Sequence, residues 1–171
     1  YTIPPRMVKV YNWIMIKCRF EHGTVAFLRH VTVGGLVVRD NKILLVRRSE
    51  QSQVEAGKWC MPGGYLDRDE SAAQAVVREI LEETGYESEV VSIFRIVDRP
   101  RMKGDDRQNV DFIYLVRAYQ QVKNPDHEVE EVRWFELDEL PHPNEVAFDH
   151  YDSFRLLIEH RHSPHILPLF N

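Results

Sequence analysis

Gly64-Tyr-Leu-Asp-Arg-Asp-Glu70-Ser-Ala-Ala-Gln-Ala-Val-Val-Arg78-Glu79-Ile-Leu-Glu82-Glu83-Thr-Gly85-Tyr86 is the stretch of this sequence that decides its fold. Ser71, followed three residues later by Gln74, forms a capping-box pattern that marks the start of a helix. Residues 72–84 contain no Pro or Gly, and Gly85 stands where a left-handed C-terminal cap is expected. The sequence therefore predicts one helix over residues 72–84.

Three glutamates share one side of this helix, because Glu79, Glu82 and Glu83 are spaced i, i+3 and i+4. They lie beside an apolar stripe made of Ala72, Ala73, Val76, Val77 and Ile80. Half-burying carboxylates is costly unless something pairs with them, and Arg78 alone cannot neutralise three. The residues leave two interpretations open. One is a solvated acidic face, and the other is a site for a hard cation such as Mg²⁺, which binds a few carboxylates and bridges to substrate phosphates.

The spacing of the whole stretch resembles the Nudix box: Gly, five residues, Glu, seven residues, Arg-Glu, an apolar residue, any residue, Glu-Glu, any residue, Gly and an apolar residue. The chain supplies all of these positions, which are Gly64, Glu70, Arg78, Glu79, Ile80, Glu82, Glu83, Gly85 and Tyr86. Tyr86 departs slightly, since the family usually has an aliphatic residue there. The resemblance implies an α/β fold, the Nudix-type α/β/α sandwich with a mixed β-sheet.

The resemblance also implies an activity, the metal-dependent hydrolysis of a nucleoside diphosphate linked to another group. ADP-ribose or a nucleotide sugar is the expected substrate, and Mg²⁺ or Mn²⁺ is the expected cofactor. The metal ligands that it implies are three carboxylates and one backbone carbonyl, those of Glu79, Glu82, Glu83 and Gly64. Arg78 and Glu70 are expected to orient the box by ion pairing or hydrogen bonding. A nucleoside triphosphate or capped-RNA pyrophosphohydrolase is one alternative, and a non-catalytic Nudix-fold binding module is another.

Length, net charge and cysteine content limit the domain count, the partners and the location that we expect. The 171 residues fit one domain (1–171), with an N-terminal extension (1–24) and a C-terminal helix and tail (148–171). The net charge of −5 gives no basic footprint for nucleic acid, so no DNA partner is expected. The sequence has no apolar run of 18 residues, so no membrane association is expected. Cys18 and Cys60 form no CxxC pair, which favours a reducing, cytoplasmic location over a disulfide or zinc framework.

The N-terminal segment from Met7 to Phe20 is ambiguous. Apolar residues recur at helical spacing, which favours a helix, but the segment is also rich enough in β-branched and aromatic residues to be a strand. Its apolar side chains either pack on the chain's own domain or form a dimer interface. A homodimer is expected by analogy with relatives that act on nucleotide sugars.

Alternating and apolar-rich runs predict strands at Val25–Val38, Ile43–Val46, Val90–Val97 and Val110–Ala118. The charged connection over residues 98–109 is long for two neighbouring strands, and such loops are often functional. The basic residues at the strand end and in this loop are either solvated surface charges or contacts to a substrate phosphate or sugar, and the candidate substrate-binding residues are Arg47, Arg99, Arg101 and Arg107.

The acidic run over residues 125–140 leads into a Trp-Phe strand, as in many Nudix enzymes. Such a run often supplies a fourth carboxylate, and Glu128 is the first candidate, ahead of Glu130 and Glu131. Glu83 or Glu128 is the expected general base. Asp149–Arg161 is expected to be the last helix, with Phe154, Leu157 and Ile158 on its buried side.

Overall fold

The computed structural model describes residues 16–99 and 109–170. Its strands are β1 (Ile16–Arg19), β2 (Val25–Leu28), β3 (His30–Arg39), β4 (Lys42–Arg48), β5 (Trp59–Cys60), β6 (Gly63–Tyr65), β7 (Tyr86–Val97), β8 (Asn109–Gln121), β9 (Val129–Glu136) and β10 (Leu169–Phe170). Its helices are α1 (Ala72–Thr84), the 3-10 helix η1 (Pro143–Glu145) and α2 (His150–His162).

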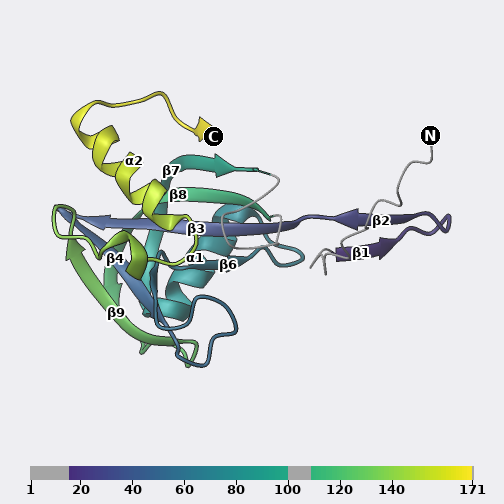
Figure 1. Ribbon diagram of the computed structural model, residues 1–171, viewed down its shortest axis with the longest axis horizontal. Coiled ribbons are helices and arrows are strands. Elements are labelled where there is room, and N and C mark those ends of the chain that lie inside the picture. Colours follow the sequence, from purple (N-terminus) through teal and green to yellow (C-terminus); the bar gives the residue numbers. More distant parts are fainter. Residues whose placement is uncertain (1–15, 100–108, 171) are drawn as a thin grey trace, which may run out of the picture.

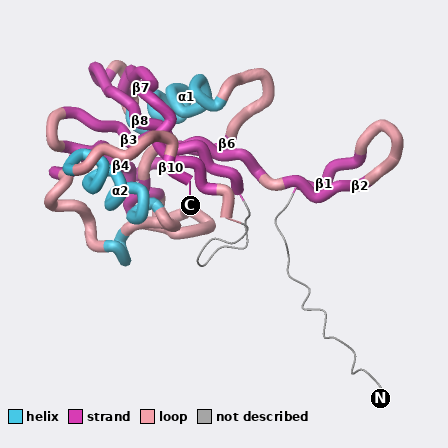
Figure 2. Tube along the Cα trace, turned by 90° about the horizontal axis from the view of Figure 1, so that it is seen from above, coloured by secondary structure: helices cyan, strands magenta, loops and turns pink. Residues whose placement is uncertain are grey.

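A mixed sheet forms the middle layer, with strand order β10-β7-β8-β3-β4-β5, while β6 pairs with β3 and β9 pairs with β4. Strands β3 and β8 run parallel, whereas β7 and β8 run antiparallel. Helix α1 lies against one face of the sheet and α2 against the other, as the two views show (Figures 1 and 2). This three-layer arrangement confirms the expected α/β/α sandwich.

Each helix packs against one face of the sheet and covers a separate apolar core. Val76 and Ile80 of α1 are fully buried in a cluster with residues of β3, β4 and β8. Phe154 and Leu157 of α2 are buried in a second cluster on the opposite face, with Phe94 of β7. Removing this apolar surface from water is the main force that holds the two helices in place.

Helix α1 begins and ends where the sequence predicts. The Ser71 side chain accepts a hydrogen bond from the Gln74 backbone N–H, and the Gln74 side chain accepts one from the Ser71 N–H, which completes the capping box. Gly85 caps the other end with φ of 74° and donates its N–H to the Leu81 carbonyl over 3.0 Å. Both ends of the acidic helix are therefore fixed by local interactions.

The glycine pair in β3, Gly34 and Gly35, allows the layers to approach closely. A Cβ at Gly35 would lie 2.8 Å from the Ile80 side chain of α1, and one at Gly34 would lie 2.6 Å from the Met61 sulfur. The two glycines face opposite sides of the sheet, so each side packs against bare backbone at this point.

The N-terminal part of the described chain differs from its prediction. Ile16–Arg19, expected to end a helix, is strand β1 of a hairpin with β2, and the rest of the expected helix lies outside the described residues. The β-branched and aromatic content outweighs the helical spacing here. The hairpin stands away from the sandwich (Figures 1 and 2) and exposes Ile16, Val25 and Leu28.

The strand expected over Val25–Val38 is interrupted at Arg29, which separates β2 from β3. The Arg29 guanidinium donates hydrogen bonds to the carbonyls of Asp98 and Arg99, so it ties the start of β3 to the end of β7. The other strand predictions hold, although β7 begins earlier and β8 ends later than expected. The last helix is confirmed as α2, with Phe154 and Leu157 buried.

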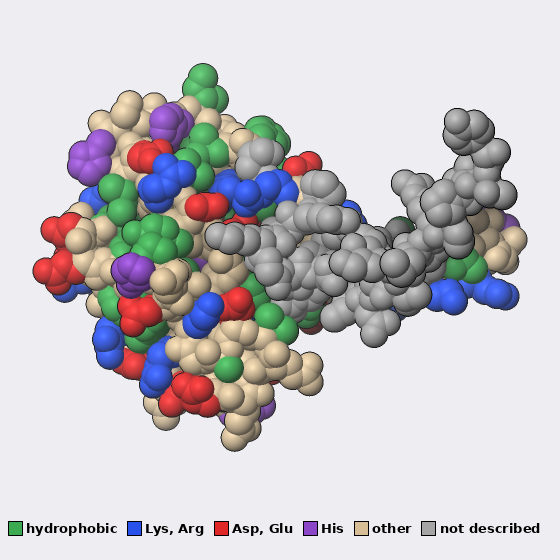
Figure 3. All heavy atoms as spheres, viewed as in Figure 1, with side chains coloured by type: hydrophobic (Ala, Val, Ile, Leu, Met, Phe, Trp, Pro, Cys, Tyr) green, Lys and Arg blue, Asp and Glu red, His purple; other side chains and the backbone are tan. Residues whose placement is uncertain are grey.

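The surface of the sandwich carries both signs of charge. On the face drawn in Figure 3, Lys and Arg side chains are interspersed with Asp and Glu side chains. Within the described residues, no helix has the length and apolar character needed to cross a membrane.

Candidate active site

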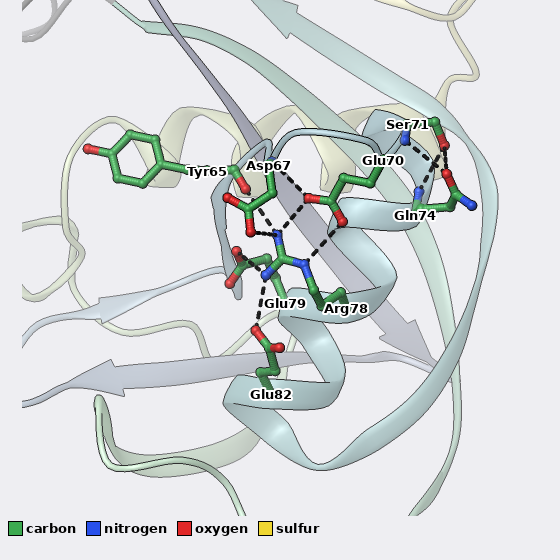
Figure 4. Close-up of polar contacts among 8 residues, drawn as sticks. All are labelled: Tyr65, Asp67, Glu70, Ser71, Gln74, Arg78, Glu79 and Glu82. Atoms are coloured by element: carbon green, nitrogen blue, oxygen red, sulfur yellow. Dashed lines mark hydrogen bonds and ion pairs between the residues drawn. The ribbon is translucent and has the colours of Figure 1, made fainter. Parts of the chain in front are cut away.

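The Arg78 guanidinium organises the acidic face of α1 (Figure 4). It contacts Glu70 through two hydrogen bonds of 2.8 and 3.1 Å, Glu79 over 2.8 Å and Glu82 over 3.0 Å. It also donates to the Tyr65 carbonyl over 3.1 Å. These carboxylates hold the pKa of Arg78 above its usual range, Glu70 first, so the charge is permanent. The ion pairing expected for Arg78 and Glu70 is therefore present, and it joins α1 to the loop ahead of it.

We expect Arg78→Lys to lower kcat/KM about tenfold, as changes to residues that orient metal ligands typically do. A lysine ammonium is a point charge and cannot hold three carboxylates and a carbonyl as the planar guanidinium does. Steady-state kinetics beside Arg133→Lys, an exposed arginine of β9, provide the check. Equal kinetics in both variants would show that the guanidinium has no role in positioning the glutamates.

Glu83 and Glu79 face the loop that precedes the helix. The Glu83 carboxylate accepts the Gly63 N–H over 2.9 Å. A Cβ at Gly64 would lie 2.5 Å from the Glu79 carboxylate, so any larger residue at position 64 would displace that carboxylate. Burial raises the pKa of Glu83 to about 8, and the nearby charges of Glu79 and Asp126 act in the same direction. Burial also raises the pKa of Glu79. Glu79 and Glu83 are both desolvated and repel each other, so a bound cation would stabilise their ionised forms.

One cavity of about 380 Å³ begins at these glutamates. We call the part lined by Gly63, Gly64, Asp67, Glu79 and Glu83 the acidic end. The lining also includes Thr32, Arg48, Tyr65, Asn109, Asp111, Glu128, Phe148 and His150. The volume lies in the range of small-ligand pockets, and the cavity combines charged groups with aromatic surface, as ligand sites do.

The structure brings together some of the sequence-predicted site residues and leaves others apart. Gly64, Glu79, Glu83 and Glu128 line the cavity. Glu128 is exposed and stands just ahead of β9, which places it at the open side of the site. Glu82 does not line the cavity, because its half-exposed carboxylate is turned to Arg78.

The candidate substrate-binding arginines are arranged differently from the prediction. Arg47 forms ion pairs with Glu130 and Glu131 and does not line the cavity, whereas its neighbour Arg48 does. Successive residues of a strand point to opposite faces, and the pairing of β4 with β9 shifts register between these two arginines.

Of the three candidate arginines in the long loop between β7 and β8, Arg99 alone lies within the described residues. Arg99 forms an ion pair of 2.5 Å with Asp149 at the start of α2, and it does not line the cavity. This pair ties the end of β7 to the helix on that face. Arg101 and Arg107 lie outside the described residues.

His150 is a cavity residue that the sequence pattern did not single out. It is the first residue of α2, and its Nδ1 accepts the Met61 N–H over 3.2 Å, so the imidazole is neutral at that nitrogen. Burial lowers the pKa of His150 to about 4, and the positive charges of Arg48 and Arg95 act in the same direction. The histidine therefore joins α2 to the loop ahead of the box as a neutral acceptor.

His150 makes the fold less stable in acid. Its pKa is lower in the folded than in the unfolded chain, so the unfolded chain binds the proton first and stability falls as pH drops from about 6.5 towards 4. We expect His150→Gln to remove about 1.5 kcal/mol of the loss between pH 6.5 and 5. Urea unfolding at both pH values, with the exposed His127→Gln as control, measures it. An unchanged pH dependence in His150→Gln would contradict this assignment.

The donor set at the acidic end fits a hard divalent cation. Within residues 16–99 and 109–170, no three His, Cys, Asp or Glu side chains already form a metal cage. Mg²⁺ does not require one, since it takes one or two carboxylates and completes its shell with waters and substrate phosphates. Glu79 and Glu83, with their raised pKa values, and the backbone at Gly64 supply that kind of site.

Comparison with known proteins agrees with this site. A family model described as the NUDIX domain matches residues 28–157. An ADP-ribose pyrophosphatase of Methanocaldococcus jannaschii is 33% identical over 121 residues, which cover 70% of this chain and 68% of that protein. The chain therefore belongs to the Nudix hydrolase family.

Solved structures share the architecture. A Nudix hydrolase from Nitrosomonas europaea superposes with a TM-score of 0.72 and 26% identity, covering 92% of this chain and 91% of that one. An ADP-ribose pyrophosphatase from Streptococcus suis superposes with a TM-score of 0.67 and 26% identity, covering 83% of this chain and 98% of that one. The three-layer sandwich is thus the fold of this hydrolase family.

Proposed function

We propose that this Nudix hydrolase cleaves the diphosphate bridge of ADP-ribose or a nucleotide sugar, with Mg²⁺ or Mn²⁺ as cofactor. The observation that carries the proposal is one cavity whose lining combines the carboxylates of Glu79 and Glu83 and the Arg48 guanidinium with aromatic, hydroxyl and amide side chains. A substrate with a charged diphosphate bridge between groups that carry rings and hydroxyls matches that combination. ADP-ribose pyrophosphatases among the relatives favour the same substrate class.

The chain's own residues divide the work. Glu79, Glu83 and the Gly64 carbonyl would hold the cation, which when bound neutralises phosphate oxygens and activates a water for in-line attack. Arg48 also lines the cavity and would bind a phosphate oxygen of the bridge. Glu128, at the open side of the cavity, is the candidate for accepting a proton from water. Arg78 positions Glu79 through their 2.8 Å contact.

A substrate screen tests the proposal. The protein would be incubated with Mg²⁺ or Mn²⁺ and ADP-ribose, nucleotide sugars, dinucleoside polyphosphates or each nucleoside triphosphate, and product phosphates would be measured after phosphatase treatment. We expect turnover of the diphosphate-linked sugars, abolished by chelator and restored by added cation. Turnover of triphosphates alone would favour the alternative pyrophosphohydrolase, and no turnover on any substrate would contradict the proposal.

A further inference from the structure

The floor of the cavity, away from the box, is built by two parallel strands. Thr32 of β3 stands in register with Asp111 of β8, and His30 stands in register with Asn109. Residues two apart on a strand point to the same face, so Thr32 and Asp111 share the side of the sheet that faces α2 with Gly34 and Ile113. Thr32, Asn109 and Asp111 all line the cavity, and we call these three residues the polar floor.

The polar floor is short of hydrogen-bond donors. The Thr32 hydroxyl donates to the Asp111 carboxylate over 3.1 Å, and within the described residues this is the one hydrogen bond of that carboxylate. The side-chain oxygen of Asn109 is buried and has no hydrogen-bond partner among residues 16–99 and 109–170. Buried acceptors left unpaired cost free energy, and natural structures usually pair them with protein, water or ligand. A ligand group that donates hydrogen bonds would therefore satisfy the acceptors of Asp111 and Asn109 in the polar floor.

The charge of the polar floor selects against an anion. Burial raises the pKa of Asp111 to about 6, and Asp149 adds to the effect, while Thr32 and Arg95 act against it. At neutral pH the carboxylate is therefore ionised and would repel a phosphate. Hydroxyl groups are neutral donors, and an ionised carboxylate forms strong, short hydrogen bonds with them.

The polar floor lies next to the acidic end. Thr32 pairs with Tyr65 of β6, and Val33 pairs with Gly64, the residue that abuts Glu79. The polar floor and Glu79 line the same cavity, and the strands that carry Thr32 and Gly64 are directly paired. A sugar on the polar floor and a phosphate at the acidic end would therefore lie in one cavity.

We propose that Thr32, Asn109 and Asp111 form a subsite that binds the adjacent hydroxyl groups of a ribose in the substrate. The Asp111 carboxylate accepts one hydroxyl hydrogen, the Asn109 oxygen accepts the other, and Thr32 positions the carboxylate. This inference rests on the proposed function for the identity of the substrate. It adds the residues that distinguish a hydroxylated sugar from a deoxygenated one.

Calorimetric titration with an uncleavable ligand tests the subsite. The ligands are α,β-methylene ADP-ribose and two analogues, each lacking the 2-hydroxyl of one of its two riboses. We expect the wild-type protein to bind one deoxy analogue about tenfold more weakly than the parent, the usual effect of losing a hydrogen bond to a charged group. Asp111→Asn should bind the parent and that analogue with nearly equal affinity.

Asp98→Asn is the matched control, because it removes the same charge from an exposed aspartate at the end of the neighbouring strand β7. It should keep the wild-type discrimination. Thr32→Val serves as a second variant if Asp111→Asn does not fold, and it should reduce the discrimination at least about threefold by freeing the carboxylate. Equal binding of all three ligands by the wild-type protein, or full discrimination in a folded Asp111→Asn or Thr32→Val, would overturn the proposal.

Binding and turnover separate this inference from the proposed function. If the wild-type protein discriminates between the uncleavable ligands but does not hydrolyse ADP-ribose with either cation, the subsite stands and the proposed reaction fails. If it hydrolyses ADP-ribose and binds both deoxy analogues as tightly as the parent, the reaction stands and the subsite fails.

Discussion

Glu83→Gln is expected to reduce kcat at least about a hundredfold while the protein stays folded, since acid–base or charge-stabilising groups contribute that much or more. The carboxylate lies in the cavity beside Glu79, and the glutamine keeps its shape but not its charge. The amide oxygen can still accept the Gly63 N–H, so the loop ahead of the helix keeps its anchor. We therefore expect the substitution to reduce catalysis without destabilising the fold.

Replacing a buried carboxylate with a neutral amide is expected to leave the melting temperature unchanged or higher, because a desolvated charge is removed. Kinetics on the substrate identified by the screen, together with thermal unfolding, measure both effects. Glu89→Gln makes the same chemical change at an exposed site of β7, where the carboxylate pairs with Arg117. It should keep full activity. A folded Glu83→Gln with near-normal kcat would remove Glu83 from the active site.

Local sequence was enough to predict the acidic helix. The Ser71 capping box and the Gly85 cap act over one turn, and the spacing of Glu79, Glu82 and Glu83 fixes their common side. The contact between Arg78 and Glu82 also follows from their separation of one turn. These features depend on residues close in the chain, so a sequence pattern contains them.

The rest of the cavity depends on contacts that no local pattern contains. Thr32 and Asp111 meet because β3 and β8 pair in parallel, and that register is set by packing across the sheet. His150 reaches the Met61 backbone from the start of a helix far along the chain. The choice of Arg48 over Arg47 depends on a register shift in β4.

Glu82 shows that carboxylates on one side of a helix can differ in their surroundings. Three glutamates share that side, yet Glu82 forms an ion pair with Arg78 and does not line the cavity, and its role as a metal ligand stays a prediction. Glu79 contacts the same Nη1 atom of Arg78, yet its carboxylate also lies against the bare backbone of Gly64 and lines the cavity. The close approach at Gly64, and not the contact with Arg78, therefore distinguishes Glu79 from Glu82.

Gly85→Ala is expected to destabilise the protein by about 3 kcal/mol, from a left-handed conformation costing 1–2 kcal/mol and a steric clash of similar size. Gly85 has a φ of +74°, and a Cβ there would lie 1.9 Å from the Lys123 carbonyl oxygen. That oxygen belongs to the backbone and cannot rotate away. The Gly85 carbonyl also accepts the Val122 N–H over 2.8 Å, so relieving the clash would pull this connection apart.

Gly23→Ala is the matched control for this prediction. Gly23 also has a positive φ, of +88°, but a Cβ there meets nothing within 4 Å. It should cost about 1 kcal/mol, the conformational part alone. Urea unfolding of both variants isolates the steric contribution as their difference. Equal destabilisation would mean that the backbone after β8 shifts without cost to accommodate the added methyl group. The C-terminal end of α1, which carries Glu83, would then be held by its cap and not by packing.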